Sequence, residues 1–146
     1  MKIKGIIVFV IFVWCSLLWA MKGDSLSEWE IITSDQSYYL KLKSDEKKMI
    51  EIDGAGQVPT LEKVECHKEQ NLCLVVYFVG EIGTQRMVKQ WNAAIYNQKT
   101  GYFEGDYPFK YEDGDRYFPQ PKYQFQKSKL IINDENSGIE KEIFYN

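Results

Sequence analysis

One feature constrains the fold of residues 61–80 more than any other. Two cysteines flank a short polar stretch, and an unbroken apolar run follows the second cysteine. The apolar run, residues 72–79, is rich in valine and aromatic side chains and ends at Gly80. Such a run is typical of a strand that is covered on both faces. The residues before Cys66 alternate in character, as in a half-exposed strand. We therefore expect a β-hairpin whose second strand, starting near Cys73, is central to a sheet.

The pairing of this hairpin follows if the two cysteines face each other across it. Val64 then lies opposite Val75, and Glu62 lies opposite Tyr77.

A disulfide bond between Cys66 and Cys73 is expected because the third cysteine, Cys15, lies in a separate N-terminal apolar run. Closing so short a loop stabilises the fold by about 2–3 kcal/mol on the chain-entropy model. The alternatives are a redox-active pair or a metal site that includes His67. Six residues separate the cysteines, which is not the CxxC spacing, and we predict no metal site.

The N-terminal residues resemble an export signal in their layout. Lys2 and Lys4 precede an uncharged apolar run over residues 5–21, and the chain then turns polar. The segment is either a signal peptide or an uncleaved membrane anchor. Both interpretations place residues 22–146, expected to be one domain, outside the cytoplasm, in the periplasm or secreted, and possibly anchored to the inner membrane.

The charge of the expected domain argues against some partners. The chain has 18 Lys and Arg and 21 Asp and Glu. Because Lys2 and Lys4 precede the domain, 16 basic and 21 acidic side chains remain, a net charge of −5. We expect no nucleic-acid partner, and membrane contact only through residues 5–21 if they are not cleaved. A basic protein partner suits this charge.

The rest of the chain reads as short alternating strands separated by turn residues. Residues 37–43 and 48–53 form one predicted hairpin, and residues 97–101 (NQKTG) are a hairpin turn closed by glycine. We expect about nine or ten strands and no long helix. The prediction is an all-β domain, a single antiparallel meander closed as a barrel, a sandwich or a small propeller-like stack, preceded by an apolar N-terminal helix.

One stretch, residues 104–121, interrupts the pattern with three prolines and with interleaved aromatic and acidic side chains. We expect a long loop here, and long loops in compact domains are often functional. The candidate binding residues in it are Tyr107, Phe109, Tyr111, Glu112, Asp113, Asp115, Arg116 and Tyr117.

Three functional interpretations of this stretch compete with a structural one. The aromatic rings and Arg116 suit a protein interface, and the carboxylates would complement a basic partner. The same rings and acids would also suit a glycan cleft in which a carboxylate pair acts on the bond. A calcium loop fails because the acids lack EF-hand spacing. In the structural interpretation the rings simply cap the core.

The sequence predicts binding rather than catalysis. The single histidine lies beside a cysteine expected to be oxidised, so a Ser-His-Asp or Cys-His arrangement has no good candidate. We predict no catalytic residue and no cofactor. The expected function is a periplasmic inhibitor or immunity-type protein that blocks a cell-wall- or membrane-acting enzyme. The alternatives are a membrane-tethered accessory subunit of an envelope complex and a glycan-binding or glycan-cleaving domain.

Overall fold

A computed structural model of the protein describes residues 22–145 as ten β-strands in three antiparallel sheets. A short 3₁₀ turn, Leu26–Glu28, precedes the first strand. The prediction of an all-β domain is confirmed. The expected N-terminal helix, residues 1–21, lies outside the described residues. Within the described part of the chain, no helix has the length and apolar character needed to cross a membrane.

The first sheet contains three strands in the order β1-β2-β3. Strands β2 and β3 come from the predicted hairpin at residues 37–53. The bounds are Trp29–Ser34 for β1, Ser37–Leu42 for β2 and Met49–Ile52 for β3.

The central sheet contains four strands in the order β4-β5-β6-β7. Its longest buried strand is β5, which starts with the apolar run that the sequence singled out, and residues 72–77 are all buried. The bounds are Thr60–His67 for β4, Leu72–Ile82 for β5, Val88–Asn97 for β6 and Tyr102–Glu112 for β7.

The third sheet has the order β10-β9-β8 and contains the last three strands of the chain. Alternation in β9 is strict: Leu130 and Ile132 are fully buried, whereas their neighbours are partly exposed. The bounds are Lys122–Phe125 for β8, Lys129–Asp134 for β9 and Ile139–Phe144 for β10.

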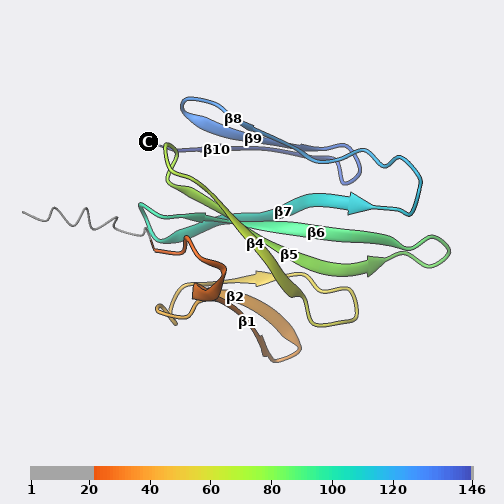
Figure 1. Cartoon of the computed structure of the whole chain (residues 1–146), viewed down its shortest axis with the longest axis horizontal. Helices are drawn as coiled ribbons and strands as arrows, with labels where there is room; N and C mark the ends of the chain where they lie inside the picture. Colours follow the sequence, from red (N-terminus) through yellow and green to blue (C-terminus); the bar gives the residue numbers. More distant parts are fainter. Residues whose placement is uncertain (1–21, 146) are drawn as a thin grey trace, which may run out of the picture.

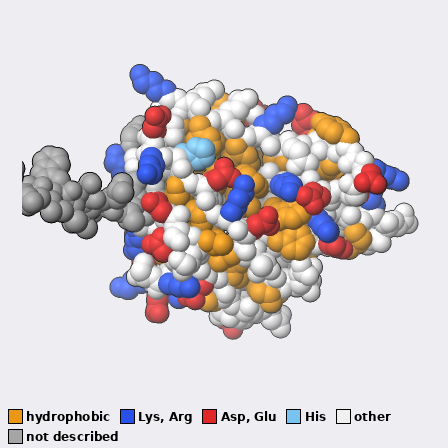
Figure 2. Space-filling view, viewed as in Figure 1, with side chains coloured by type: hydrophobic (Ala, Val, Ile, Leu, Met, Phe, Trp, Pro, Cys, Tyr) orange, Lys and Arg blue, Asp and Glu red, His pale blue; other side chains and the backbone are white. Residues whose placement is uncertain are grey.

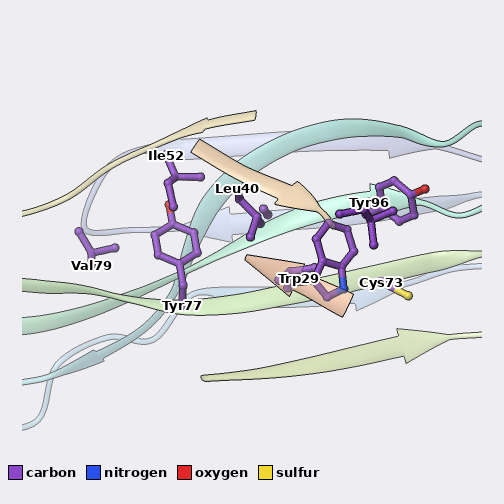
Figure 3. Close-up of a cluster of buried hydrophobic side chains, with 10 residues drawn as sticks. Trp29, Leu40, Ile52, Cys73, Tyr77, Val79 and Tyr96 are labelled. Carbon is purple, nitrogen blue, oxygen red and sulfur yellow. The ribbon is translucent and has the colours of Figure 1, made fainter. Parts of the chain in front are cut away.

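The three sheets form layers, with the central sheet between the other two (Figure 1). One hydrophobic core lies between the first sheet and the central sheet. In Figure 3, Leu40 and Ile52 of the first sheet lie near Tyr77 of the central sheet. The second core lies between the opposite face of the central sheet and the third sheet, and it includes Val76 and Ile132. Because side chains alternate across β5, this strand supplies both cores.

Trp29 fixes the start of the first sheet. Its indole Nε1 donates to the carbonyl oxygen of Gly23 at 2.8 Å, and its ring meets Tyr96 edge-on at 5.1 Å. Gly23 has a φ of +92°, and a Cβ there would lie 2.9 Å from the Trp29 ring. Glycine is therefore required at this close approach.

A single meander closed as a barrel is wrong, because none of the three sheets closes on itself. The predicted continuity fails at residues 53–59 and 113–121. These two segments do not form tight hairpins; they carry the chain from one layer to the next. They contain three of the four prolines, which removes backbone donors that a hairpin ladder would use.

The disulfide between Cys66 and Cys73 is present, and the pairing of Val64 with Val75 is confirmed. The predicted pairing of Glu62 with Tyr77 is wrong. Leu61 lies opposite Tyr77 instead, because a β-bulge between Leu61 and Lys63 shifts the register by one residue.

The antiparallel strands place their connections at two opposite ends of the layers (Figure 1). We call the end near Lys22 the N-proximal end and the opposite end the far end. The N-proximal end consists of residues 22–28, 43–48, 68–71, 98–101 and 126–128. The far end consists of residues 35–36, 53–59, 83–87, 113–121 and 135–138.

Candidate functional site

The first half of the predicted loop at residues 104–121 is strand β7, so that prediction is wrong for residues 104–112. Two features let this sequence form a strand. Strand β7 is an edge of the central sheet, so Pro108 can sit in it opposite Asn92. Two β-bulges in the pairing with β6 also absorb the irregular pattern of side chains.

Three of the predicted binding residues, Tyr107, Phe109 and Tyr111, contact the interior between the central and third sheets. Tyr107 and Phe109 pack against the second core, and the Phe109 ring lies 5.5 Å from that of Tyr123. Tyr111 is buried, and its hydroxyl donates to Asp134 Oδ2 at 2.7 Å. These rings therefore join the two sheets.

Asp134, which receives the Tyr111 hydroxyl, is itself buried at the end of β9. Burial raises the pKa of its carboxyl, but hydrogen bonds from Ser137, Tyr111 and Asn136 outweigh that effect and hold the pKa below its usual value. The charged form of Asp134 is therefore well satisfied and stabilises this contact.

The remaining loop, residues 113–121, is fastened to the edge of β7. The Gln120 side-chain amide accepts from the Tyr111 backbone N–H at 2.9 Å and donates to the Tyr111 carbonyl at 2.8 Å. Asn136 Nδ2 also donates to the carbonyl of Pro119 at 2.6 Å. The chain between Asp113 and Arg116 forms a tight turn, with the Arg116 N–H donating to the Asp113 carbonyl at 3.0 Å.

A cavity of about 350 Å³ lies at the far end, between this loop and the β5–β6 hairpin. Three charged side chains, Glu81, Lys89 and Glu112, form a row across its floor, because Lys89 pairs with Glu81 on β5 and with Glu112 on β7. The other lining residues are Met87, Tyr111, Asp113, Gly114, Arg116, Phe118 and Gln120.

Asp113 is the buried charge of this cavity, and it forms an ion pair with Arg86 of the β5–β6 hairpin. The Asp113 side chain is 9% exposed, whereas that of Arg86 is 47% exposed. The guanidinium therefore covers the carboxylate and joins the hairpin to the loop on the other side of the cavity.

Four predicted residues line the far-end cavity, namely Tyr111, Glu112, Asp113 and Arg116. Asp115 and Tyr117 lie beside it on the exposed turn, and Tyr117 is 88% exposed.

The site predicted from the sequence did not include residues 81–89, although this hairpin forms part of the cavity. Successive antiparallel hairpins place every second turn at the same end of a sheet, so the turns after β5 and β7 must be neighbours. Counting strands would have predicted the contact between Arg86 and the loop.

The far end also exposes large apolar side chains, of which Met87 lines the cavity. Ile82 and Met87 are 43% and 48% exposed on the β5–β6 hairpin, and Val58 is 57% exposed in the β3–β4 connection. That connection contacts the end of β5 through the Ala55 N–H, which donates to the Val79 carbonyl at 3.1 Å. With Tyr117 of the loop after β7, the far end exposes four large apolar side chains on three of its segments.

The acidic side chains of residues 104–115 do not gather at one site. Asn97 Nδ2 donates to Glu104 Oε1 at 3.0 Å near the N-proximal end, and Asp106 lies in the first core face. Glu112 and Asp113 line the far-end cavity. The acids of this stretch therefore do not form one cluster.

A buried polar network around Asp106 was not predicted. The Tyr77 hydroxyl donates to Asp106 Oδ2 at 2.5 Å, and Asn92 Nδ2 donates to the same oxygen at 3.4 Å. Among the described residues, no group bonds the second oxygen, Oδ1, which is shielded from solvent. Burial is the main cause that raises the pKa of Asp106 to about 7; the nearby Asp53 acts in the same direction, and the two hydrogen bonds oppose both.

The disulfide and His67 are accounted for by structural contacts. The His67 ring stacks on Phe125 at 3.7 Å, so it packs β4 against the third sheet. Asp24 lies near the sulfurs of Cys66 and Cys73. Because the two sulfurs are bonded to each other, they do not offer the thiolates that a metal ion would need.

Comparison of the chain with protein-family models, with curated proteins and with solved structures gave no match.

Proposed function

We propose that this protein is a non-catalytic extracytoplasmic binding protein that holds a protein partner at its far end. The proposal rests on the large apolar side chains that are exposed at the far end, where the cavity also lies. Val58, Ile82, Met87 and Tyr117 are four of eight large hydrophobic side chains that are well exposed in the described residues. Gathered exposed apolar side chains mark interaction sites more often than scattered ones do.

The chemistry of the far end suits a protein partner. Tyr117 and Arg116 are of the residue types that dominate binding energy in protein interfaces. The far-end turns carry five acids, Asp35, Asp53, Asp113, Asp115 and Glu135, against Arg86 and Arg116. A basic surface on the partner would complement this end and accelerate association.

The most concrete form of the proposal is an inhibitor or immunity-type protein that occludes a cell-wall- or membrane-acting enzyme. An extracytoplasmic address is supported by the apolar run at residues 5–21 and by the disulfide between Cys66 and Cys73. The Arg86–Asp113 ion pair joins the β5–β6 hairpin to the loop after β7, and so it orders this loop before a partner binds.

A membrane-tethered accessory subunit is the second candidate, and the position of Lys22 favours it. The Lys22 carbonyl accepts from Gln98 Nε2 at 3.3 Å in the β6–β7 turn, at the N-proximal end. A tether that joins the domain there leaves the far end pointing away from the membrane, where a subunit of a larger assembly can reach it.

The experiment is capture of partners from an envelope extract by the full chain. The far-end variant combines Met87→Ala, Arg116→Ala and Tyr117→Ala, all of which are exposed. The matched control combines Met49→Ala, Tyr102→Ala and Lys47→Ala, which are exposed at the opposite end. A partner that the parent and control retain, and that the far-end variant loses, supports the proposal.

Retention of the same partner by the far-end variant would contradict the proposed site. The glycan alternative is distinguished by adding soluble peptidoglycan fragments to the capture experiment. If these fragments bind the parent chain and no protein is retained, a glycan ligand replaces the protein partner.

A further inference from the structure

The N-proximal end gathers lysines that are far apart in the sequence. Hydrogen bonds and ion pairs join its segments. The Lys22 ammonium lies 3.6 Å from Asp45 of the β2–β3 turn, and the Asn71 carbonyl of the β4–β5 turn accepts from the Gln98 N–H at 2.8 Å. Tyr145, which follows β10, donates its N–H to the Ser128 carbonyl of the β8–β9 turn at 3.1 Å.

The connecting segments at the two ends carry opposite net charges. The five N-proximal segments contain seven lysines against five acids, a net charge of +2. The five far-end segments contain two arginines against five acids, a net charge of −3. The seven lysines are Lys22, Lys43, Lys47, Lys48, Lys68, Lys99 and Lys127. Figure 2 shows lysine side chains around the end where the described chain starts, mixed with acids.

Exposed apolar side chains accompany these lysines. Tyr102 and Phe144 are 63% and 65% exposed, Met49 is 42% exposed and Leu26 is 37% exposed, all at strand ends or turns of the N-proximal end. The Lys48 ammonium lies 4.5 Å from the centre of the Tyr102 ring. Aromatic rings beside lysines are typical of protein surfaces that sit at the headgroup level of a bilayer.

We propose that the N-proximal end is a membrane-docking surface that lies against anionic phospholipid headgroups. The sequence supplies the reason for this occupant: the apolar run at residues 5–21 ends immediately before Lys22, which belongs to this end. A bilayer that holds the run is therefore next to the lysines. Near an anionic leaflet each lysine adds to the attraction, while Tyr102 and Phe144 enter the interfacial layer.

This inference departs from the expectation that the net charge of −5 keeps the domain away from anionic membranes. The net charge is a sum over the whole domain, but electrostatic attraction falls off within about 10 Å in salt. A bilayer at the N-proximal end is thus attracted by the local lysines, and the acids of the far end lie too far away to oppose it.

The test measures how close each end lies to the lipid headgroups. The full chain with Cys15→Ser and a single new cysteine is labelled with a fluorescent dye and reconstituted into vesicles that contain a headgroup quencher. Ser128→Cys places the dye at the N-proximal end, and Thr84→Cys places it at the far end. The vesicles contain either phosphatidylcholine alone or equal parts of phosphatidylcholine and phosphatidylglycerol.

The proposal predicts that quenching of the dye at position 128 is at least about twofold stronger with phosphatidylglycerol, and that about 0.5 M salt removes the difference. Dye at position 84 stays unquenched in both vesicles. Replacing Lys43, Lys47 and Lys68 by glutamine removes the difference at position 128.

The matched control replaces Lys63, Lys122 and Lys141 by glutamine, an equal change of charge on strands away from the N-proximal end. This control leaves the quenching unchanged. Equal quenching at position 128 in the two kinds of vesicle, or equal loss in both triple variants, would overturn the proposal. Neither result touches the far-end site, which the capture experiment tests separately.

Discussion

At the scale of single residues, the position of a side chain decides whether it acts in the core or at the surface. Tyr111 and Tyr117 are six residues apart in one aromatic and acidic stretch, yet Tyr111 is 7% exposed and Tyr117 is 88% exposed. Composition alone cannot separate the two, because the difference depends on where β7 ends.

This contrast predicts different costs for two similar substitutions. Tyr111→Ala should lower the free energy of unfolding by about 3–5 kcal/mol, because it removes a buried ring between β7 and β9 and one of the hydrogen bonds that Asp134 accepts. Tyr117→Ala should change it by less than about 0.5 kcal/mol. Urea unfolding of both variants measures the difference, and equal destabilisation would contradict the described packing. Tyr111→Phe isolates the hydroxyl, with an expected loss of about 1–2 kcal/mol.

Asp106 predicts a pH dependence of stability. Its pKa is about 7 in the folded chain against the ordinary value of 3.8, so the folded state holds the proton more tightly. The stabilising contribution of Asp106 to the free energy of unfolding is therefore fully present below about pH 4. It declines as the pH rises and is lost above about pH 7. Asp106→Asn should remove this decline and raise the free energy of unfolding at pH 8 by about 1–3 kcal/mol.

Urea unfolding of the parent and of Asp106→Asn at pH 5 and pH 8 tests this account. Glu140→Gln, an exposed change on β10, is the control and should leave the pH dependence intact. If Asp106→Asn is less stable than the parent at pH 8, the ionised Asp106 does not destabilise the fold and the predicted pH dependence is wrong. A well-solvated carboxylate would give that result.

At the scale of strands and turns, the sequence predicted most elements where pattern and turn chemistry agree. The apolar run of β5 and the turn at residues 97–101 are examples. In that turn the Gly101 N–H donates to the Asn97 carbonyl at 2.7 Å, and Gly101 has a φ of +73°. Strand β7 was missed because Pro108 normally argues against a strand. Only the position of β7 at a sheet edge permits that proline, and edge position depends on the whole sheet.

The cysteine hairpin carries a prediction at this scale. Replacing Cys66 and Cys73 by alanine should lower the free energy of unfolding by about 2–3 kcal/mol, because the bond closes a short loop in the unfolded chain. The strands should still form, since the pairs from Val64 with Val75 onwards do not depend on the sulfurs. Circular dichroism with and without reductant measures both effects, and loss of all β structure in the variant would contradict this view.

At the scale of the whole molecule, the division into three sheets could not be predicted from local pattern. A turn inside a sheet and a connection between sheets can have similar lengths, and the β2–β3 turn is nearly as long as the β3–β4 connection. Prolines mark the two layer changes in hindsight. The far-end cavity could not be predicted either, because the β5–β6 hairpin that forms its other wall carries no motif of its own.

The layered fold also separates two surfaces that have opposite charge. The far end carries acids and exposed apolar side chains, and the N-proximal end carries lysines, one of them beside Tyr102. We assign a protein partner to the far end and a bilayer to the N-proximal end. The two ends should therefore have different neighbours in the same cell, a protein at one end and lipid at the other.

Photo-cross-linking in intact membranes compares the neighbours of the two surfaces in one experiment. A photoreactive amino acid replaces Tyr117 at the far end or Tyr102 at the N-proximal end of the full chain, and adducts are resolved by mass. We expect a discrete protein adduct from position 117 and only lipid adducts from position 102. The same protein adduct from both positions, or a protein adduct from position 102 alone, would contradict this expectation.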